Sequence, residues 1–277
     1  MSMRASNELV YDSARPRLAI WEDALELFRY RDLLWGLVQR DLTVRYKRSI
    51  LGFLWTMLNP LLTMIVLTIV FSTLFRFEFQ HFAVYLLSGL LLWNFFAQST
   101  TQAIHNLLWA GSLVNKIYIP KPIFVVSALI VGLVNLMLAL IPLALIMLIS
   151  QHPFSPALFF LPIPIALVFM FALGVGLFVT TLAIFFVDVV DIYQVGLMIL
   201  FYLSPIIYPL SILPERYLFF IRFNPMYYFL ELFRQPIYDG TLPAAGLVGR
   251  AALLALSALL AGWWFFTKKA DEFAYRV

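Results

Sequence analysis

Residues 122–187 read PIFVVSALIVGLVNLMLALIPLALIMLISQHPFSPALFFLPIPIALVFMFALGVGLFVTTLAIFFV, a run of 66 positions without Asp, Glu, Lys or Arg. A helix of about 20 apolar residues already crosses the hydrocarbon core of a bilayer. The polar, proline-containing cluster SQHPFSP at 150–156 divides the run and is typical of a turn. The run therefore predicts two membrane-spanning helices joined by a tight turn. Continuous apolar runs favour helices over barrel strands, in which apolar residues alternate.

The composition of the whole chain also indicates a membrane protein. Hydrophobic residues make up 63% and charged residues 12% of the 277 residues, against roughly half and a quarter in ordinary globular proteins. A soluble domain of this size could not hide so much apolar surface from water. The absence of cysteine excludes a disulfide scaffold, a cysteine zinc cluster and an iron–sulfur site. The pI is about 9.3, but the basic residues lie where helices leave the membrane, so we expect no nucleic-acid partner.

We expect an all-α integral membrane protein with six transmembrane helices. The spans are predicted at about 50–75, 82–104, 122–149, 157–186, 192–210 and 244–267. They form a transmembrane domain over 49–267, between an N-terminal segment at 1–48 and a tail at 268–277. Lys and Arg number 14 on one side of this topology and five on the other. Because cytoplasmic loops carry an excess of Lys and Arg, both termini are predicted to be cytoplasmic. No cleavable signal peptide is expected.

An amphipathic helix is predicted before the first span. Leu18, Trp21, Leu25 and Phe28 recur at helical spacing, and charged residues occupy the other face. Such a helix lies on the membrane surface. It is either a simple anchor or a lever that also contacts a soluble partner.

Residues 209–243 do not fit a plain helix bundle. Pro214 starts one short helix, Asn224-Pro225 starts a second, and Pro236 ends it. Each is about ten residues, or roughly 15 Å, which is too short to cross. Nine of the 22 residues from 217 to 238 are aromatic, so an exposed loop is excluded. We expect two re-entrant or interfacial helices between the fifth and sixth spans.

Several functional classes are disfavoured by what the sequence lacks. The first four spans contain no ionisable residue, although ion-coupled carriers need one to hold the ion. His81, His105 and His152 have no second ligand nearby in the sequence, so we expect no metal. The sequence has no phosphate-binding Gly-rich loop and no hydrolase motif. We therefore expect a transport subunit that is not itself an enzyme and binds no cofactor, with a soluble ATPase on the cytoplasmic face supplying the energy.

Four stretches of the sequence resemble one transporter family. They are residues 39–60 (QRDLTVRYKRSILGFLWTMLNP), residues 86–96 (LLSGLLLWNFF), residues 115–121 (NKIYIPK), and the outer series SPIIY at 204–208, ILP at 212–214 and NPMY at 224–227. In this order they resemble type-2 ABC transporter permeases that export polysaccharides, such as the O-antigen, capsule and teichoic-acid exporters. The segment from Ser204 to Tyr227 is most similar to the O-antigen branch. One departure is Phe185-Phe186-Val187-Asp188, where the family usually has an arginine before the aspartate.

The resemblance implies a half-transporter of the bacterial inner membrane. Two copies would form the pathway, and two copies of a separate ATPase subunit, which holds ATP and magnesium, would dock below. The substrate would be a polysaccharide linked to undecaprenyl diphosphate. Two alternatives remain open: a type-2 exporter of a small hydrophobic drug or lipid, and a facilitator or assembly factor that acts without an ATPase.

The candidate substrate path is aromatic. Ring faces attract the C–H groups of sugars without fixing their position, which suits a sliding polymer. The residues assigned to the path are Tyr227, Tyr228, Phe229, Phe223, Tyr208 and Trp93. For Tyr227, Tyr228 and Phe229, packing of the short helices is an equally weighted alternative.

Two further sets of candidates lie at the cytoplasmic face. Arg45, Lys47 and Arg48 precede the first span and are assigned to the carrier diphosphate, with positive-inside anchoring as the alternative. The segment from His105 to Lys121 is predicted to couple to the ATPase through a short helix at 106–109. The coupling residues are Asn106, Trp109, Lys116, Tyr118, Lys121, Asp188 and Asp191. An inert turn and ordinary solvated loop charges are the alternatives.

Overall fold

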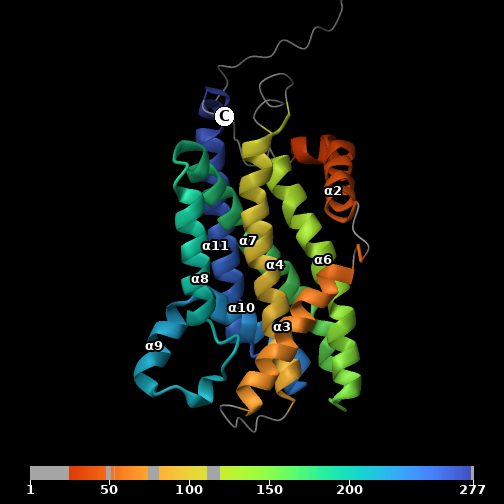
Figure 1. The fold of residues 1–277 in the computed structure, drawn as a ribbon. Helices are drawn as coiled ribbons and strands as arrows, with labels where there is room; N and C mark the ends of the chain where they lie inside the picture. Colours follow the sequence, from red (N-terminus) through yellow and green to blue (C-terminus); the bar gives the residue numbers. More distant parts are fainter. Residues whose placement is uncertain (1–24, 48–50, 53, 74–80, 111–118, 276–277) are drawn as a thin grey trace, which may run out of the picture.

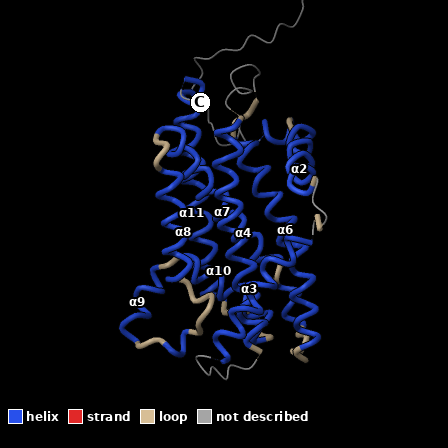
Figure 2. Tube along the Cα trace, viewed as in Figure 1, coloured by secondary structure: helices blue, strands red, loops and turns tan. Residues whose placement is uncertain are grey.

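The computed structural model describes residues 25–47, 51–52, 54–73, 81–110 and 119–275. Within these ranges the chain is helical and contains no strand (Figure 2). The all-α expectation is therefore confirmed for the part of the chain that is described. Leu18, Trp21, Arg48, Lys116 and Tyr118 lie outside the described residues. Of the predicted amphipathic helix, only its end is described, where residues 25–29 are helical and Leu25 and Phe28 are exposed.

The helices follow one another in the order shown in Figure 1. Their bounds are α2 (Arg31–Tyr46), α3 (Leu54–Thr73), α4 (Phe82–Trp109), α6 (Pro122–Ile149), α7 (Pro162–Phe185), α8 (Val189–Leu203), α9 (Glu215–Phe223), α10 (Pro225–Arg234) and α11 (Ala245–Lys269). Short 3-10 segments lie at Pro156–Phe160, Leu210–Ile212 and Ala270–Tyr275, and a π-helical turn lies at Gln235–Asp239.

Five of these helical segments are long and apolar enough to cross a membrane. They are Leu54–Phe71, Phe82–Trp109, Pro122–Ile149, Pro156–Phe185 and Ala245–Lys269. The predicted fifth span at 192–210 is instead the 15-residue helix α8, which begins earlier and ends at Leu203. It ends there because Ser204 is extended and Pro205 follows, and a proline cannot continue the hydrogen-bonding pattern of a helix. Six full-length spans are therefore not present in the described chain.

The two short helices predicted from the prolines are present as α9 and α10. Pro214 is the N-cap of α9, and Pro225 is the first residue of α10. Pro236 does not end the helical conformation, because the chain continues as the π-helical turn until Gly240, which has a φ of 65°. In Figure 1, α9 lies to one side of the bundle, whereas α10 lies within its lower half and packs against α4, α7 and α11.

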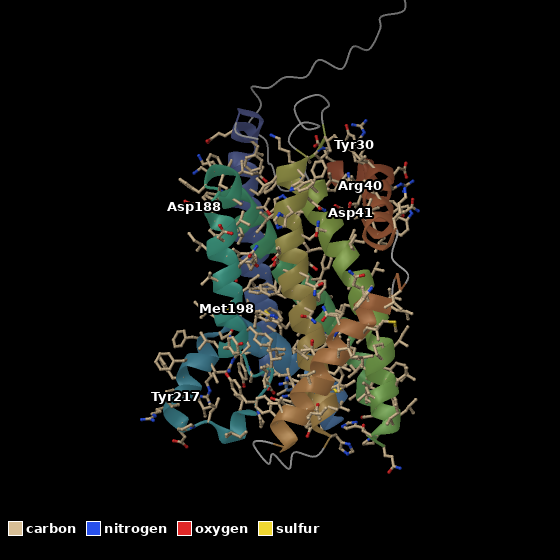
Figure 3. The ribbon with its side chains drawn as sticks, viewed as in Figure 1. Tyr30, Arg40, Asp41, Asp188, Met198 and Tyr217 are labelled. Carbon is tan, nitrogen blue, oxygen red and sulfur yellow. The ribbon has the colours of Figure 1, made fainter. Side chains whose placement is uncertain are left out.

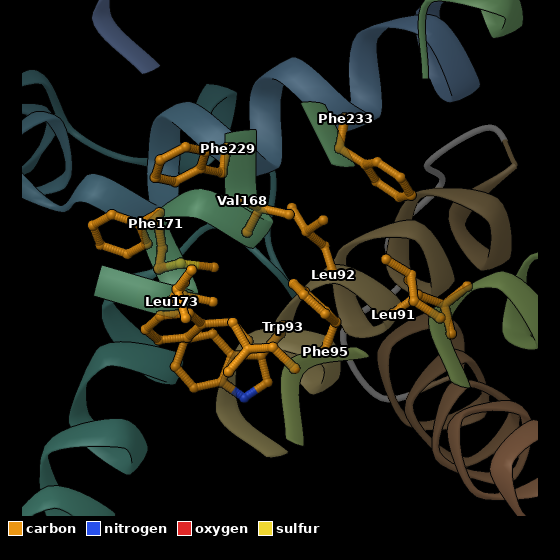
Figure 4. Packing of buried hydrophobic residues seen from close by; sticks show 14 of the residues in the cluster. Leu91, Leu92, Trp93, Phe95, Val168, Phe171, Leu173, Phe229 and Phe233 are labelled. Carbon is orange, nitrogen blue, oxygen red and sulfur yellow. The ribbon is translucent and has the colours of Figure 1, made fainter. Parts of the chain in front are cut away.

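Helix α4 is at the centre of the bundle. Of the residues in its span, 78% are buried, against 11% in the span of α3. Helix α4 packs against α3, α6, α7 and α10. Figure 4 shows the rings and aliphatic side chains that fill this core, including Trp93 from α4, Phe171 from α7 and Phe229 from α10. Helices α7 and α11 form a second extensive contact.

Glycines allow the closest helix crossings. A Cβ on Gly262 of α11 would lie 2.0 Å from the carbonyl oxygen of Gly174 on α7, and a Cβ on Gly132 of α6 would lie 1.8 Å from the Ser99 hydroxyl on α4. Small residues at such crossings let two backbones approach and gain dispersion contacts, which are the main attraction between helices in lipid. These two crossings hold α11 on α7 and α6 on α4.

The two ends of the bundle differ in what they carry. Helix α2 and the end of α11 lie at one end, whereas α9 and α10 lie at the other (Figure 1). Asp188, Arg40 and Asp41 are at the first end and Tyr217 of α9 is at the second (Figure 3). The described parts of the segments predicted to be cytoplasmic thus share one end, and the proline-rich, aromatic segments share the other.

Candidate functional site: a proline-broken aromatic end and a polar interior

A hydrogen-bonded junction joins the break after α8 to the start of α10. The Asn224 side chain caps α10 by accepting from the Met226 backbone N–H at 2.9 Å, and it donates to the Ser204 hydroxyl at 2.8 Å. Ser204 in turn donates to the Leu200 carbonyl at 2.7 Å. An asparagine at an N-cap satisfies a backbone donor that the helix cannot. Two proline motifs 20 residues apart in the sequence are therefore held together by one side chain.

A buried arginine clamps the same junction. Arg234 is 3% exposed, donates to the Pro205 carbonyl at 2.9 Å, and lies with its guanidinium 3.7 Å from the ring centroid of Tyr85 on α4. The Tyr85 hydroxyl donates to the carbonyl oxygens of Tyr208 and Pro205 at 2.9 and 3.2 Å. The guanidinium occupies the space beside Gly89, where a Cβ would lie 2.5 Å from its Nη2. Carbonyls freed by the proline break are thus satisfied by α4 and α10.

Sequence reasoning missed the role of Arg234. It was treated as one of five charges on the outer side, whereas the structure buries it. A signal was present, because this arginine stands within an aromatic stretch and is followed by Pro236. A buried arginine needs several acceptors to offset its desolvation, and the sequence does not show which carbonyls supply them.

His152 contacts Tyr238 and His81 at the same end of the bundle. Its Nε2 lies 2.9 Å from the Tyr238 carbonyl oxygen, and its ring meets that of His81 edge-on at 5.0 Å. Burial raises the pKa of Asp239, and Arg234 and His152 oppose this shift. Within the described residues no three His, Asp or Glu side chains gather as a metal site would require.

The predicted aromatic path residues separate into two groups. Phe223 is 73% exposed, and its ring meets Phe219 at 4.7 Å on α9. Tyr227 and Tyr228 are half-buried with their rings 5.1 Å apart, and the Tyr228 hydroxyl donates to the Arg222 carbonyl at 2.9 Å. These three rings form an accessible aromatic surface beside the junction.

The second group is enclosed by the bundle. Phe229 is fully buried with its ring 4.8 Å from that of Phe171, and Trp93 is 6% exposed with its ring 5.5 Å from that of Phe201. Tyr208 is half-buried and donates to the Tyr202 carbonyl at 2.8 Å. For Phe229 and Trp93 this geometry favours packing over contact with a substrate.

At the opposite end, the predicted coupling helix is part of α4. Residues 106–109 form the last turn of α4, and Asn106 donates to Asp41 of α2 at 2.9 Å. Trp109 is 86% exposed. Lys121 caps α6, donates to the Ala270 carbonyl and lies over the Phe273 ring at 5.4 Å. Residues 106–109 are helical as predicted, but they continue α4 and do not form a helix of their own, because no glycine or proline lies between Leu90 and Trp109.

The other predicted cytoplasmic-end residues are accessible where the structure describes them. Asp188 and Asp191 are exposed at the turn between α7 and α8, and Lys47 is exposed at the end of α2. Arg45 lies in α2, but its side chain is not among those that the structure describes. The structure does not bring these acids and bases into one cluster.

The interior contains polar cavities that the sequence analysis did not identify. One, of about 310 Å³, lies between α3, α4 and α6 and is lined by Asn59, Asn94, Gln98 and Asn135 among others. A second, of about 700 Å³, lies between α2, α4 and α6 and includes Arg40, Asp41 and Asn106. Both volumes fall in the roughly 300–1,000 Å³ range of small-molecule sites.

Five helical segments of this length and apolarity within the described residues indicate a multi-pass membrane protein. A family model described as ABC-2 type transporter matches residues 32–238. The chain belongs to this ABC-2 type transporter family.

Curated relatives align over most of the chain. The O-antigen export system permease protein RfbA of Myxococcus xanthus is 30% identical over 253 residues, which cover 90% of this chain and 96% of that protein. The protein of the same name from Klebsiella pneumoniae is 30% identical over 214 residues, covering 76% and 82%. The polysialic acid transport protein KpsM of Escherichia coli is 22% identical over 232 residues, covering 82% and 89%.

Proposed function

We propose that this chain is the permease subunit of an ATP-driven exporter that moves a polysaccharide, carried on a lipid diphosphate, out of the cytoplasm. O-antigen is the favoured product. The observation that carries this proposal is the alignment over 90% of the chain with a relative named for O-antigen export. An accessible aromatic surface at one end, formed by Phe223, Tyr227 and Tyr228, suits a sliding glycan, because ring faces hold sugars without fixing their position.

The proposed topology has six crossings in the bacterial inner membrane. Helix α8 spans only about 22 Å at helical rise, so the following segment, residues 204–212, completes the fifth crossing. Helices α9 and α10 dip into the outer leaflet as the re-entrant pair, and the segment before α2 lies on the inner surface. The grouping of α2 with the end of α11, which carries Lys268 and Lys269, supports placing both termini in the cytoplasm.

The polymer path is proposed to lie between two copies of the chain. Helix α4 fills the centre of a single chain with buried side chains, and the cavities among the described residues lie to its side. A long glycan therefore has no route through one copy. Phe223, Tyr227, Tyr228 and Tyr208 would contact sugar at the exit, and Trp93 and Phe229 would support them by packing.

Energy is proposed to come from two copies of an ABC ATPase subunit, which bind ATP and magnesium. This chain binds no cofactor in the proposal. Trp109, Lys121, Asp188 and Asp191 lie at the end of the bundle that would face the ATPase. Lys116 and Tyr118, which lie outside the described residues, are proposed to act with them. Arg45, Lys47 and Arg48 are proposed to hold the carrier diphosphate at the same end, because arginine binds phosphate oxygens bidentately.

Deletion of the gene tests the proposal. Cells without the chain should lose surface polysaccharide and accumulate lipid-linked glycan inside, and the intact chain should restore export. Export should also require the ATPase that co-purifies with the chain. Normal surface polysaccharide in the deletion strain, or loss of a drug or lipid efflux activity instead, would refute the proposed function.

A further inference from the structure

Four carboxamide side chains recur at every fourth position of α4. They are Asn94, Gln98, Gln102 and Asn106. Residues four apart in a helix lie on the same face, so these amides form one polar stripe along α4. We call these four residues the amide track.

The amide track connects the two polar cavities. The cavity between α3, α4 and α6 includes Asn94, Gln98 and Gln102, and the cavity beside α2 includes Gln102 and Asn106. Gln102 lines both. The track therefore leads from α2, at the end proposed to be cytoplasmic, to the middle of α4.

Further polar groups from neighbouring helices face the end of the track that carries Asn94 and Gln98. Asn59 of α3 and Asn135 of α6 line the same cavity. Ser99 also lines it, and its hydroxyl is buried without a hydrogen-bond partner. Gly132 lets α6 approach this hydroxyl. Polar side chains from three helices thus surround one cavity at mid-depth of the apolar spans.

The two ends of the track differ in how their amides are used. Gln102 donates to Asn106 at 2.8 Å, and Asn106 donates to Asp41 at 2.9 Å. The structure gives the side chains of Asn94 and Gln98 no hydrogen-bond partner among the described residues. An amide without a partner in an apolar region costs roughly 1–3 kcal/mol. Asn94 is half-buried and Gln98 is exposed, so both amides are open to water or a ligand at this depth of the apolar spans.

Charge at the track restricts the class of ligand. Arg40 and Asp41 line the cavity beside α2 and form an ion pair at 2.8 Å (Figure 3). Their charges offset one another, and the cavity between α3, α4 and α6 has no charged lining residue among those described. A diphosphate has no counter-charge there. A carboxamide both donates and accepts hydrogen bonds, which matches a sugar hydroxyl.

We propose that the amide track binds a neutral saccharide segment of the exported substrate through its hydroxyl groups, with Asn94 and Gln98 as the contacting residues. This inference rests on the proposed function. It adds a binding site within each copy, beside the aromatic path between copies. In the alternative, the amides only join α3, α4 and α6 to one another, as polar side chains do in many membrane bundles.

Cysteine protection tests the site directly, because the chain contains no cysteine of its own. Single variants Asn94→Cys and Gln98→Cys are placed in membranes and treated with a negatively charged, water-soluble methanethiosulfonate. Both should be labelled, since a hydrated thiol can form the reactive thiolate. Leu145→Cys is the control, because Leu145 is 52% exposed on the apolar surface of α6 and should remain unlabelled.

Two probes separate the sugar from its carrier. Lipid-linked glycan extracted from the deletion strain should slow labelling of Asn94→Cys and Gln98→Cys. Undecaprenyl diphosphate without sugar should not. Equal protection by both probes, or protection by neither, would overturn the proposal.

Apolar variants give a second, independent measurement. Asn94→Leu and Gln98→Leu should each weaken binding of the lipid-linked glycan about fivefold, which corresponds to one neutral hydrogen bond of about 1 kcal/mol. Gln39→Leu, the same change at an exposed position of α2 outside both cavities, should leave binding unchanged. Wild-type affinity in both track variants would overturn the proposal, and so would an equal loss in the Gln39 control.

The outcomes distinguish the two proposals. If the deletion strain exports normally, the proposed function itself fails. If export is lost but the extracted glycan binds wild type and track variants alike, the function stands and the amide track is not its binding site. Where a leucine variant does not insert, the cysteine protection result decides.

Discussion

The crossing of α7 and α11 predicts a large effect from one methyl group. In Gly262→Ala the new Cβ would lie 2.0 Å from the carbonyl oxygen of Gly174, whereas ordinary contact begins near 3.4 Å. The obstacle is backbone and cannot rotate away, so the two helices would have to move apart by about 1.4 Å. A gap of roughly 0.5–1 Å already loses a quarter to a half of a dispersion contact. Overpacking of this kind costs about 1–3 kcal/mol.

A matched control on α11 should change in the opposite direction. Gly249→Ala meets nothing within 4 Å, so it should only gain helix propensity, which is worth up to about 1 kcal/mol. The free energy of unfolding of Gly262→Ala should fall by about 2 kcal/mol, which lowers the ratio of folded to unfolded chain roughly 30-fold. Thermal melts followed by size-exclusion chromatography in detergent compare the two. If Gly262→Ala melts as high as Gly249→Ala, the close crossing described here is wrong.

Three further predictions concern the proline-broken end. Asn224→Ala removes the cap of α10 and the bond to Ser204, so it should lower the free energy of unfolding by about 2 kcal/mol and speed proteolysis after α8. Asn224→Ser keeps a neutral capping oxygen and has no amide to donate to Ser204, so it should lose about half as much, and equal losses would argue against the second bond. Arg234→Met removes the charged hydrogen bond to the Pro205 carbonyl, which keeps only the longer one from Tyr85, and should lower the melting point by the equivalent of about 2 kcal/mol, whereas an unchanged melt would contradict the clamp. Tyr227→Leu should reduce export while the protein still inserts normally. Phe229→Leu should instead lower the free energy of unfolding by about 1 kcal/mol. Loss of export in Phe229→Leu and loss of stability in Tyr227→Leu would place Phe229 on the path.

Element positions that depend on local signals were predictable from the sequence. The span at 122–149 has the predicted bounds, and α9 and α10 begin where Pro214 and Asn224-Pro225 predict. In these cases the length of an apolar run, or a proline at the first turn, fixes the element without help from distant residues. Of the span predicted at 192–210, only the part up to Leu203 is the helix α8. The break at Ser204-Pro205 was not predicted, because the apolar run continues past it.

Partners that are distant in the sequence were not predictable. Asn106 was assigned to a coupling helix, yet it meets Asp41, which lies 65 positions earlier. Arg234 was counted as a charge outside the membrane, yet it is enclosed by Tyr85 and the Pro205 carbonyl, which are 149 and 29 positions away. Hydropathy and spacing describe one helix at a time, and neither states which face another helix will cover.

The polar interior shows why a lack of charges in the spans did not exclude a polar site. Asn94, Gln98, Gln102 and Asn106 keep α4 neutral but supply both donors and acceptors along one face. If α3 closed on this face, Asn94 and Gln98 would each lose a hydrogen bond to water at a cost of roughly 1–3 kcal/mol. Closure of α3 on α4 would gain only dispersion contacts, and lipid tails make equally good contacts with the same side chains. The limited burial of α3, at 11% of its span, is consistent with that balance. A neutral hydrogen-bonding ligand changes the balance, because it can satisfy the amides as α3 approaches.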